Sequence, residues 1–156
     1  MTMANEWDHR SLKYWHPLFE TRYMDMLTQI ENLITKDPDN FYHHTMYKFF
    51  ESVTDCIKDR IFPHPDHSNF LLGNTLGKAH RDWRRAKNGL PNRYRLFFKF
   101  SSTDNAIVLA WLNDHSTLRK DGSKTDVYHV FQKMLNAGEI PTDFQALMKA
   151  SSISGI

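Results

Sequence analysis

The spacing of apolar side chains changes near residue 82 from a helical repeat to strict alternation, and this change constrains the fold more than any other feature. Before it, apolar residues recur every three or four positions, which predicts amphipathic helices. After it, alternate residues are apolar, as in strands. The order predicts one α+β domain over residues 1–156, in which an N-terminal helical pair and a C-terminal helix pack on one face of a small, twisted antiparallel sheet.

Local signals give the expected bounds of the first elements. Residues 10–15 are a candidate strand, and Pro17 suits the first turn of a helix. The helix is broken at residues 36–39. Asp37 is expected to cap a second helix that has Pro38 at its first position. Two further prolines, at positions 63 and 65, end that helix.

The second half predicts three strands, at residues 82–88, 93–101 and 106–113, with turn residues between the first two. The third is apolar on both faces, as in a central strand that is covered on both sides. A helix then follows, with Thr125 as its cap and Gly138 at its end. Residues 141–149 are expected to form a last short helix, and residues 151–156 to fray.

Charge is distributed unevenly along the chain, although the net charge is only +2. Residues 78–99 carry eight Lys or Arg and one acid, a local charge of +7. Residues 1–77 carry seven Lys or Arg and eleven Asp or Glu, a local charge of −4. Residues 100–156 carry five Lys or Arg and six Asp or Glu, a local charge of −1. A short segment this basic in an otherwise acidic chain predicts a polyanion or an acidic protein as partner.

The basic segment coincides with the first predicted hairpin. If its turn pairs Lys87 with Arg93, then Arg85 lies opposite Arg95 and four cations share one face. Facing like charges destabilise a ladder by up to about 1 kcal/mol per pair. A single cation fits an ordinary solvated face, but a cluster that accepts this cost is better explained by a bound anion.

Such a face could also catalyse cleavage of RNA. The 2′-hydroxyl must lose a proton and attack phosphorus, and the departing 5′-oxygen must gain one. Guanidinium groups suit the charge that builds up on the phosphate. Because neighbouring cations favour the neutral form of a lysine, Lys87 is expected to be the base.

Other chemistries are less well supported. His64, Asp66 and His67 are few for a zinc site, and no P-loop or Gly-x-Ser-x-Gly motif is present. No metal or cofactor is expected. The remaining candidate acid–base groups are more often surface residues: His80, His115 and His129. Trp83 is more often a core anchor than a base-stacking platform.

Several features favour the cytoplasm. The one cysteine, Cys56, cannot form an internal disulfide. The N-terminus lacks the basic start and apolar stretch of a signal peptide. The longest apolar run, around residues 107–112, is far shorter than the ~20 residues of a membrane span.

Two runs in the basic segment resemble the central hairpin of RelE-like toxins: Asp82-Trp83-Arg84-Arg85-Ala86-Lys87 and Arg93-Tyr94-Arg95-Leu96-Phe97-Phe98. Later runs resemble the YhaV branch in particular: Trp111-Leu112-Asn113-Asp114, Thr117-Leu118-Arg119, and Gly122 with Lys124-Thr125-Asp126-Val127-Tyr128. The helical pair around Lys36-Asp37-Pro38 also fits that branch. The resemblance spans residues 10–148 and implies a RelE-like fold.

The resemblance implies a metal-independent endoribonuclease that cuts mRNA, generally in the ribosomal A site, by 2′-hydroxyl attack. By position, it implies these catalytic residues: Arg85, Lys87, Arg95, Arg119 and Tyr128. Arg85 and Arg95 are expected to clamp the phosphate and Arg119 to assist the leaving group. Tyr128 would stack on a base, transfer a proton or simply pack. The remaining basic residues expected to contact RNA are Lys78, Arg81, Arg84, Arg93 and Lys120.

The resemblance also implies partners. They are a cognate AbrB-like antitoxin that covers the basic hairpin, and operator DNA bound by the toxin–antitoxin pair. Two alternatives remain open at this point. One is a non-enzymatic module that binds nucleic acid or the ribosome. The other is a decayed toxin that acts only as co-repressor with its antitoxin.

Overall fold

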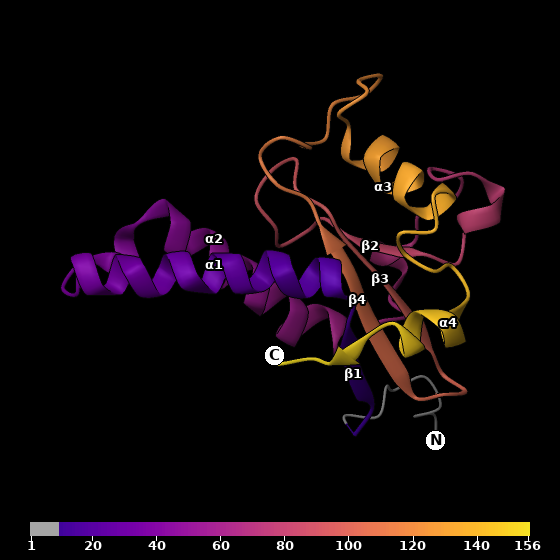
Figure 1. Cartoon of the computed structure of the whole chain (residues 1–156), viewed down its shortest axis with the longest axis horizontal. Coiled ribbons are helices and arrows are strands. Elements are labelled where there is room, and N and C mark those ends of the chain that lie inside the picture. The colour runs from indigo at the N-terminus through magenta and orange to yellow at the C-terminus, as the bar shows by residue number, and fades with distance from the viewer. Residues whose placement is uncertain (1–9) are drawn as a thin grey trace.

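A mixed five-stranded sheet with helices on both faces forms the centre of the computed structural model, which describes residues 10–156 (Figure 1). The spatial order is β2-β3-β4-β1-β5. The strands are β1 (Leu12–Trp15), β2 (Arg84–Ala86), β3 (Leu96–Ser101), β4 (Ala106–Leu112) and β5 (Ser152–Ile153). The predicted α+β class is confirmed. The expected lack of a signal peptide concerns residues 1–9, which lie outside the described residues.

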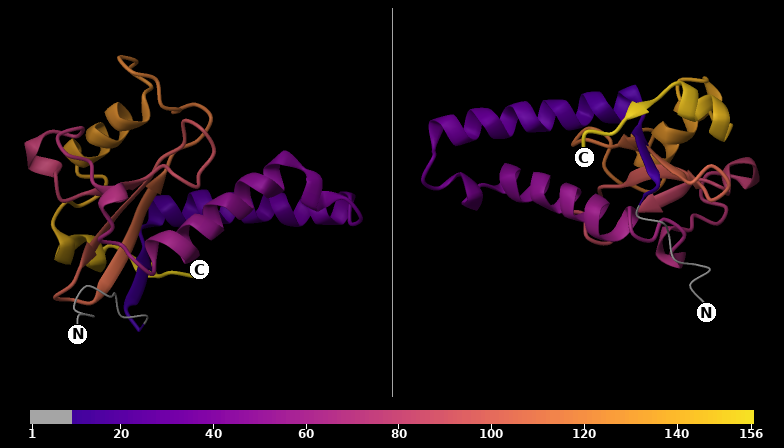
Figure 2. Two further views of the ribbon diagram at one scale, coloured as in Figure 1. Left: turned by 180° about the vertical axis from the view of Figure 1, so that it is seen from behind. Right: turned by 90° about the horizontal axis from the view of Figure 1, so that it is seen from below.

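Four α-helices and a π-helix are the main helical elements among residues 10–156: α1 (Pro17–Lys36), α2 (Thr45–Asp55), the π-helix (Cys56–Ile61), α3 (Val127–Asn136) and α4 (Phe144–Lys149). Helices α1 and α2 lie side by side and extend well past the sheet (Figures 1 and 2). None of the helices in this part of the chain has both the length and the apolar character to cross a bilayer.

Helix α1 begins as predicted, with Pro17 in its first turn and the His16 side chain accepting a hydrogen bond from the Leu18 N–H at 3.1 Å. Of its predicted apolar face, Phe19 and Met26 lie in the core that packs on the sheet, and Ile30 is also buried. Ile34, near the far end, is 38% exposed because the helical pair there has no sheet beneath it.

The expectation that Asp37 and Pro38 begin the second helix is wrong. The Asp37 N–H donates to Leu33 O at 2.8 Å and so ends α1 instead. Residues 38–44 are needed to reverse the chain, and α2 begins at Thr45.

The sheet is mixed, which corrects the expectation of a purely antiparallel one. β1 runs parallel to β4, with Leu12 opposite Ala106 and Trp15 opposite Leu109. The other pairs are antiparallel. The alternation of apolar residues sets which face a strand buries but not the direction of its neighbour, so the sequence pattern could not reveal this pairing.

Both faces of the sheet are covered, so the expectation that helices pack on one face is also wrong. One core contains residues of α1 and α2 together with Leu96 and Phe98 of β3. The other contains residues of α3 and α4 together with Phe97. β4 contributes to both and is buried along its whole length, as its sequence predicted. Trp83 is fully buried, as expected of a core anchor.

Helix α3 carries the strongest local signals at its two ends. Its cap is Asp126, not the predicted Thr125, because the Asp126 carboxylate accepts a hydrogen bond from the Tyr128 N–H at 3.1 Å. Gly138 closes the helix as predicted, with φ +76°. Its N–H bonds to Leu135 O, and the N–H of Glu139 bonds to Met134 O, which together form a Schellman motif.

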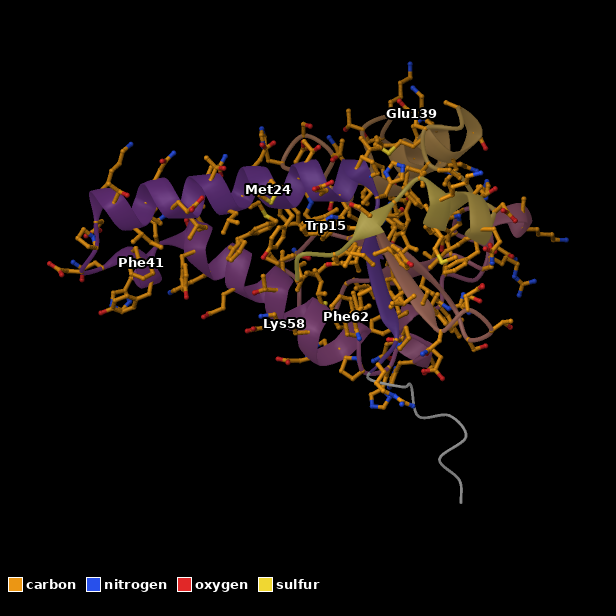
Figure 3. The ribbon with its side chains drawn as sticks, turned by 60° about the horizontal axis from the view of Figure 1, so that its bottom comes forward. Trp15, Met24, Phe41, Lys58, Phe62 and Glu139 are labelled. Carbon is orange, nitrogen blue, oxygen red and sulfur yellow. The ribbon has the colours of Figure 1, made fainter. Side chains whose placement is uncertain are left out.

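The C-terminal tail pairs with the sheet instead of fraying. β5 lies antiparallel to β1, and the Ser154 N–H donates to Lys13 O at 2.8 Å. Gly155 lies against Trp15, so closely that a Cβ there would be 2.9 Å from a ring carbon. Figure 3 shows Trp15 beside this strand. Two paired residues are too few to give a periodic signal, which is why the sequence did not predict them.

Removal of residues 151–156 is expected to lower the free energy of unfolding by about 1–2 kcal/mol, because it uncovers Trp15 and breaks the β1–β5 pairing. The melting temperature should fall by about 2–8 °C in a thermal scan. Ile153→Ser is the control, since this side chain is 62% exposed and its loss should have little effect. An unchanged melting temperature after truncation would show that the tail does not stabilise the fold.

Candidate active site

The hydroxyl of Tyr128 is the point where the predicted catalytic residues meet. Tyr128 lies in the first turn of α3 and is 8% exposed. Its Oη accepts hydrogen bonds from Nη1 of Arg85 and from Nε of Arg95, each at 3.1 Å. Three residues that are far apart in the sequence, from β2, from the segment before β3 and from α3, thus converge on one oxygen.

Arg119 joins this cluster through the ring of Tyr128. Its guanidinium lies over the ring, 5.1 Å from the centroid, within the range of a cation–π contact. Its Nη1 also pairs with Oδ1 of Asp126 at 2.7 Å. The structure therefore brings together four of the five predicted catalytic residues. We call Arg85, Arg95, Arg119 and Tyr128 the tyrosine–arginine cluster.

Asp126 holds two parts of the site in place. Besides capping α3 and pairing with Arg119, it accepts a hydrogen bond from the Lys120 N–H at 2.6 Å. Burial acts to raise the pKa of this carboxyl, but the hydrogen bonds from Arg119 and the backbone, with the charge of Arg119, outweigh it and hold the pKa below its usual value. Asp126 is thus a fixed anion behind the cationic cluster.

The hairpin register differs from the predicted one by two residues. Arg85 is opposite Phe97, not Arg95, and Arg93 lies outside the strands in a turn, with φ +73°. Because the difference is even, Arg85 and Arg95 still point to the same face. The side chain of Arg85 is fixed further by Nη2, which donates to Leu71 O at 2.9 Å.

Asn113, which the sequence analysis did not single out as a functional residue, anchors the Arg95 backbone. It is fully buried at the end of β4, and its Oδ1 accepts from the Arg95 N–H at 2.8 Å. Its Nδ2 donates to Thr117 O at 2.7 Å and to Arg93 O at 3.3 Å. An amide directly after a wholly apolar strand was the signal that could have identified it, since buried polar groups need partners.

Lys87, the predicted base, lies outside the hydrogen bonds of the cluster. Within residues 10–156 it makes no hydrogen bond to Arg85, Arg95 or Tyr128. It is exposed, and it lines a pocket of about 190 Å³ beside Arg60 and Phe70.

The residues predicted to contact RNA are not all on one face. Four are exposed: Lys78, Arg81, Arg93 and Lys120. Arg84 points away from Arg85 and lies over the Phe100 ring, 5.5 Å from the centroid. Burial lowers the pKa of Arg84, although the charges of the nearby Asp82 and Asp66 act to raise it. Lys99, which contributes to the charge of +7, is buried and paired with Asp82 at 2.7 Å, so its charge is already balanced.

The predicted histidines lie outside the tyrosine–arginine cluster. His80 has a buried Nδ1 without a hydrogen-bond partner among the described residues, and His129 is exposed on α3. His115 lines a separate pocket with Arg22 of α1. In residues 10–156, no three His, Cys, Asp or Glu side chains are grouped as metal ligands.

Comparison with known proteins assigns the chain to a family. Residues 13–152 match the model of a family described as "Toxin with endonuclease activity, of toxin-antitoxin system". The chain belongs to the YhaV toxin family. The sequence-based assignment to this family is confirmed, and with it the prediction of a nucleic-acid-cutting enzyme from a toxin–antitoxin system. A toxin of this kind has a cognate antitoxin.

Two relatives cover most of this YhaV-family chain. It is 39% identical over 137 residues to the Ribonuclease toxin YhaV of Escherichia coli K12, a match that covers 87% of this chain and 88% of the relative. It is also 39% identical over 142 residues to the Toxin YhaV of Escherichia coli O6:H1, covering 90% and 92%. No solved structure matches the chain with significance.

Asp126→Asn is expected to destabilise the protein by about 1–2 kcal/mol at neutral pH, since Asn still caps α3 but cannot pair with the partly exposed Arg119 as an anion. A carboxyl whose pKa is lowered in the folded state stabilises above its unfolded pKa of about 3.9 and loses this contribution as pH falls through the folded pKa. Urea unfolding at several pH values should therefore show the two proteins converging in acid. If the difference in free energy of unfolding between the two proteins did not change with pH, the proposed role of the Asp126 charge would be contradicted.

Proposed function

We propose that this chain is an endoribonuclease toxin that cuts mRNA without a metal ion, on the ribosome, and so stops translation and growth. The observation that carries the proposal is the Tyr128 hydroxyl held by two arginines, with a third arginine over its ring. The name of the K12 relative, Ribonuclease toxin YhaV, supports RNA as the substrate.

The chemistry that fits these groups is attack by the 2′-hydroxyl on the adjacent phosphorus. The O2′–P bond forms and the P–O5′ bond breaks, which leaves a cyclic phosphate and a 5′-hydroxyl end. Charge grows on the non-bridging oxygens in the transition state. Arg85 and Arg95 are positioned to donate hydrogen bonds to those oxygens, because both guanidinium groups already meet at one point and need little rearrangement.

Two proton transfers complete the reaction. Lys87 follows Arg85 by two residues, is exposed, and is proposed to take the proton of the 2′-hydroxyl. The Tyr128 oxygen accepts both of its hydrogen bonds, so its own proton remains available for the departing 5′-oxygen. Arg119 would stabilise negative charge as it develops there.

The proposed partners follow from exposed cations. Four of the predicted RNA-contacting residues, Lys78, Arg81, Arg93 and Lys120, are exposed and can contact phosphates of mRNA in the ribosomal A site. An AbrB-like antitoxin that covers the basic hairpin would block RNA binding, and the toxin–antitoxin pair would bind operator DNA. Because all of these partners are in the bacterial cytoplasm, the toxin is proposed to act there.

Expression of the chain alone in bacteria tests the proposal. Growth arrest is expected, with new 5′-hydroxyl ends inside coding regions when total RNA is mapped. Arg85→Ala should remove these ends, because it removes a hydrogen-bond donor to the phosphate and one of the two hydrogen bonds to the Tyr128 hydroxyl. Phasing of the cuts with codons would support the ribosome as the site of action. Soluble, folded protein that allows normal growth and gives no new ends would instead favour a non-enzymatic binding module.

A further inference from the structure

A pocket of about 190 Å³ lies beyond the end of β2, between the π-helix (Cys56–Ile61) and the turn that follows Lys87. Its charged and imidazole lining consists of two cations, one carboxylate and two histidines: Arg60, Lys87, Asp59, His64 and His67. The buried ring of Phe70 also lines it. None of the hydrogen bonds of the tyrosine–arginine cluster involves a lining residue.

The wall formed by the π-helix is unusual in itself. π-helical turns are rare and are frequently found at functional sites. Here the turn of residues 87–90 approaches this wall closely. A Cβ at Gly89 would lie 2.9 Å from Nε of Arg60, and the backbone there has φ +88°, which glycine tolerates best. The Arg60 side chain therefore lies directly against the turn that follows β2.

A short edge segment connects this pocket to the tyrosine–arginine cluster. Phe70 and Asn69 line the pocket, and the next residue, Leu71, accepts the hydrogen bond from Arg85 through its carbonyl. Leu71 is 51% exposed. Lys87 itself follows Arg85 by two residues along the chain, or about 7 Å in extended backbone. The pocket lies on the side of the core that contains Phe70, and the cluster on the side of the core that contains Tyr128. The two sites thus border the β2 edge of the sheet from its two faces.

From this arrangement we propose that the pocket binds the ribonucleotide whose 2′-hydroxyl attacks, and so sets which base is preferred on the 5′ side of the cut. The proposal rests on the proposed ribonuclease function. Lys87 would face the 2′-hydroxyl of that nucleotide, and Arg85 the phosphate that follows it. Arg60 would hold the phosphate on its other side.

The lining suits a base better than a simple anion. The His67 ring packs edge-on against Phe70, with centroids 6.2 Å apart, and provides an aromatic surface for stacking. Its Nδ1 accepts the Asn69 N–H at 3.0 Å, which leaves Nε2 free to meet a base or sugar. The amides of Asn69 and Asn88, both exposed, offer donors and acceptors for base edges.

Binding of a short single-stranded RNA with 2′-fluoro riboses, which lack the attacking hydroxyl, tests the pocket. His67→Ala should weaken binding about fivefold or more through loss of stacking. Arg60→Gln should weaken it and reduce the salt slope of log K by about 0.7, the value for one cation on a single strand. Lys58→Gln is the matched control, since Lys58 is exposed on the same π-helix (Figure 3) but is not among the residues that line the pocket.

Mapping of cut sites in a randomised RNA gives the second readout. His67→Ala and Asn69→Ala should flatten the preference at the base directly 5′ of the cut and leave other positions unchanged. Wild-type affinity and preference in these variants, while Arg85→Ala abolishes cutting, would overturn the subsite and leave the ribonuclease proposal intact. If the wild type cuts no RNA, the affinities alone decide, and equal affinities again overturn it. Variants that lose antitoxin binding but keep RNA affinity would identify a protein contact and refute the nucleotide site.

Discussion

The complete burial of β4 is the constraint on which the rest of this structure depends. A strand with apolar side chains on both faces must be covered twice, so α1 and α2 pack on one face and α3 and α4 on the other. The polar side chains of the site therefore lie at the β2 edge of the sheet and in the loop that follows β4, and not on the faces of the sheet. The tyrosine–arginine cluster lies where that edge and that loop meet the start of α3.

Two buried polar side chains fix this meeting point. Asn113 joins the end of β4 to the Arg93 and Arg95 backbone and to the loop at Thr117. Asp126 joins that loop, through Arg119 and the Lys120 N–H, to the first turn of α3, which carries Tyr128. Each satisfies several partners at once, and such networks hold a unique geometry. The cations are therefore held in one arrangement without RNA, as the proposed electrostatic catalysis requires.

The sequence predicted the features that depend on the alternation of side chains along a strand, and missed those that depend on individual contacts between residues. Arg85 and Arg95 were placed on one face although the assumed register was two residues off, because alternation preserves the face under an even shift. Four of the predicted catalytic residues then lay together. The position of Lys87 depends instead on where β2 ends. The parallel pairing of β1 with β4, and the pairing of the tail strand β5, depend on contacts between residues far apart in the sequence, and the period of the apolar residues carries no information about them.

Cleavage by a Tyr128→Phe variant is the most direct test of the claim that the tyrosine–arginine cluster is catalytic. The change removes one oxygen and keeps the ring beneath Arg119, so the fold and the cation–π contact should persist. Under single-turnover conditions the cleavage rate is expected to fall by about 100-fold or more, while RNA affinity stays near that of the wild type. Cleavage by folded Tyr128→Phe at the wild-type rate would contradict a catalytic role of the cluster.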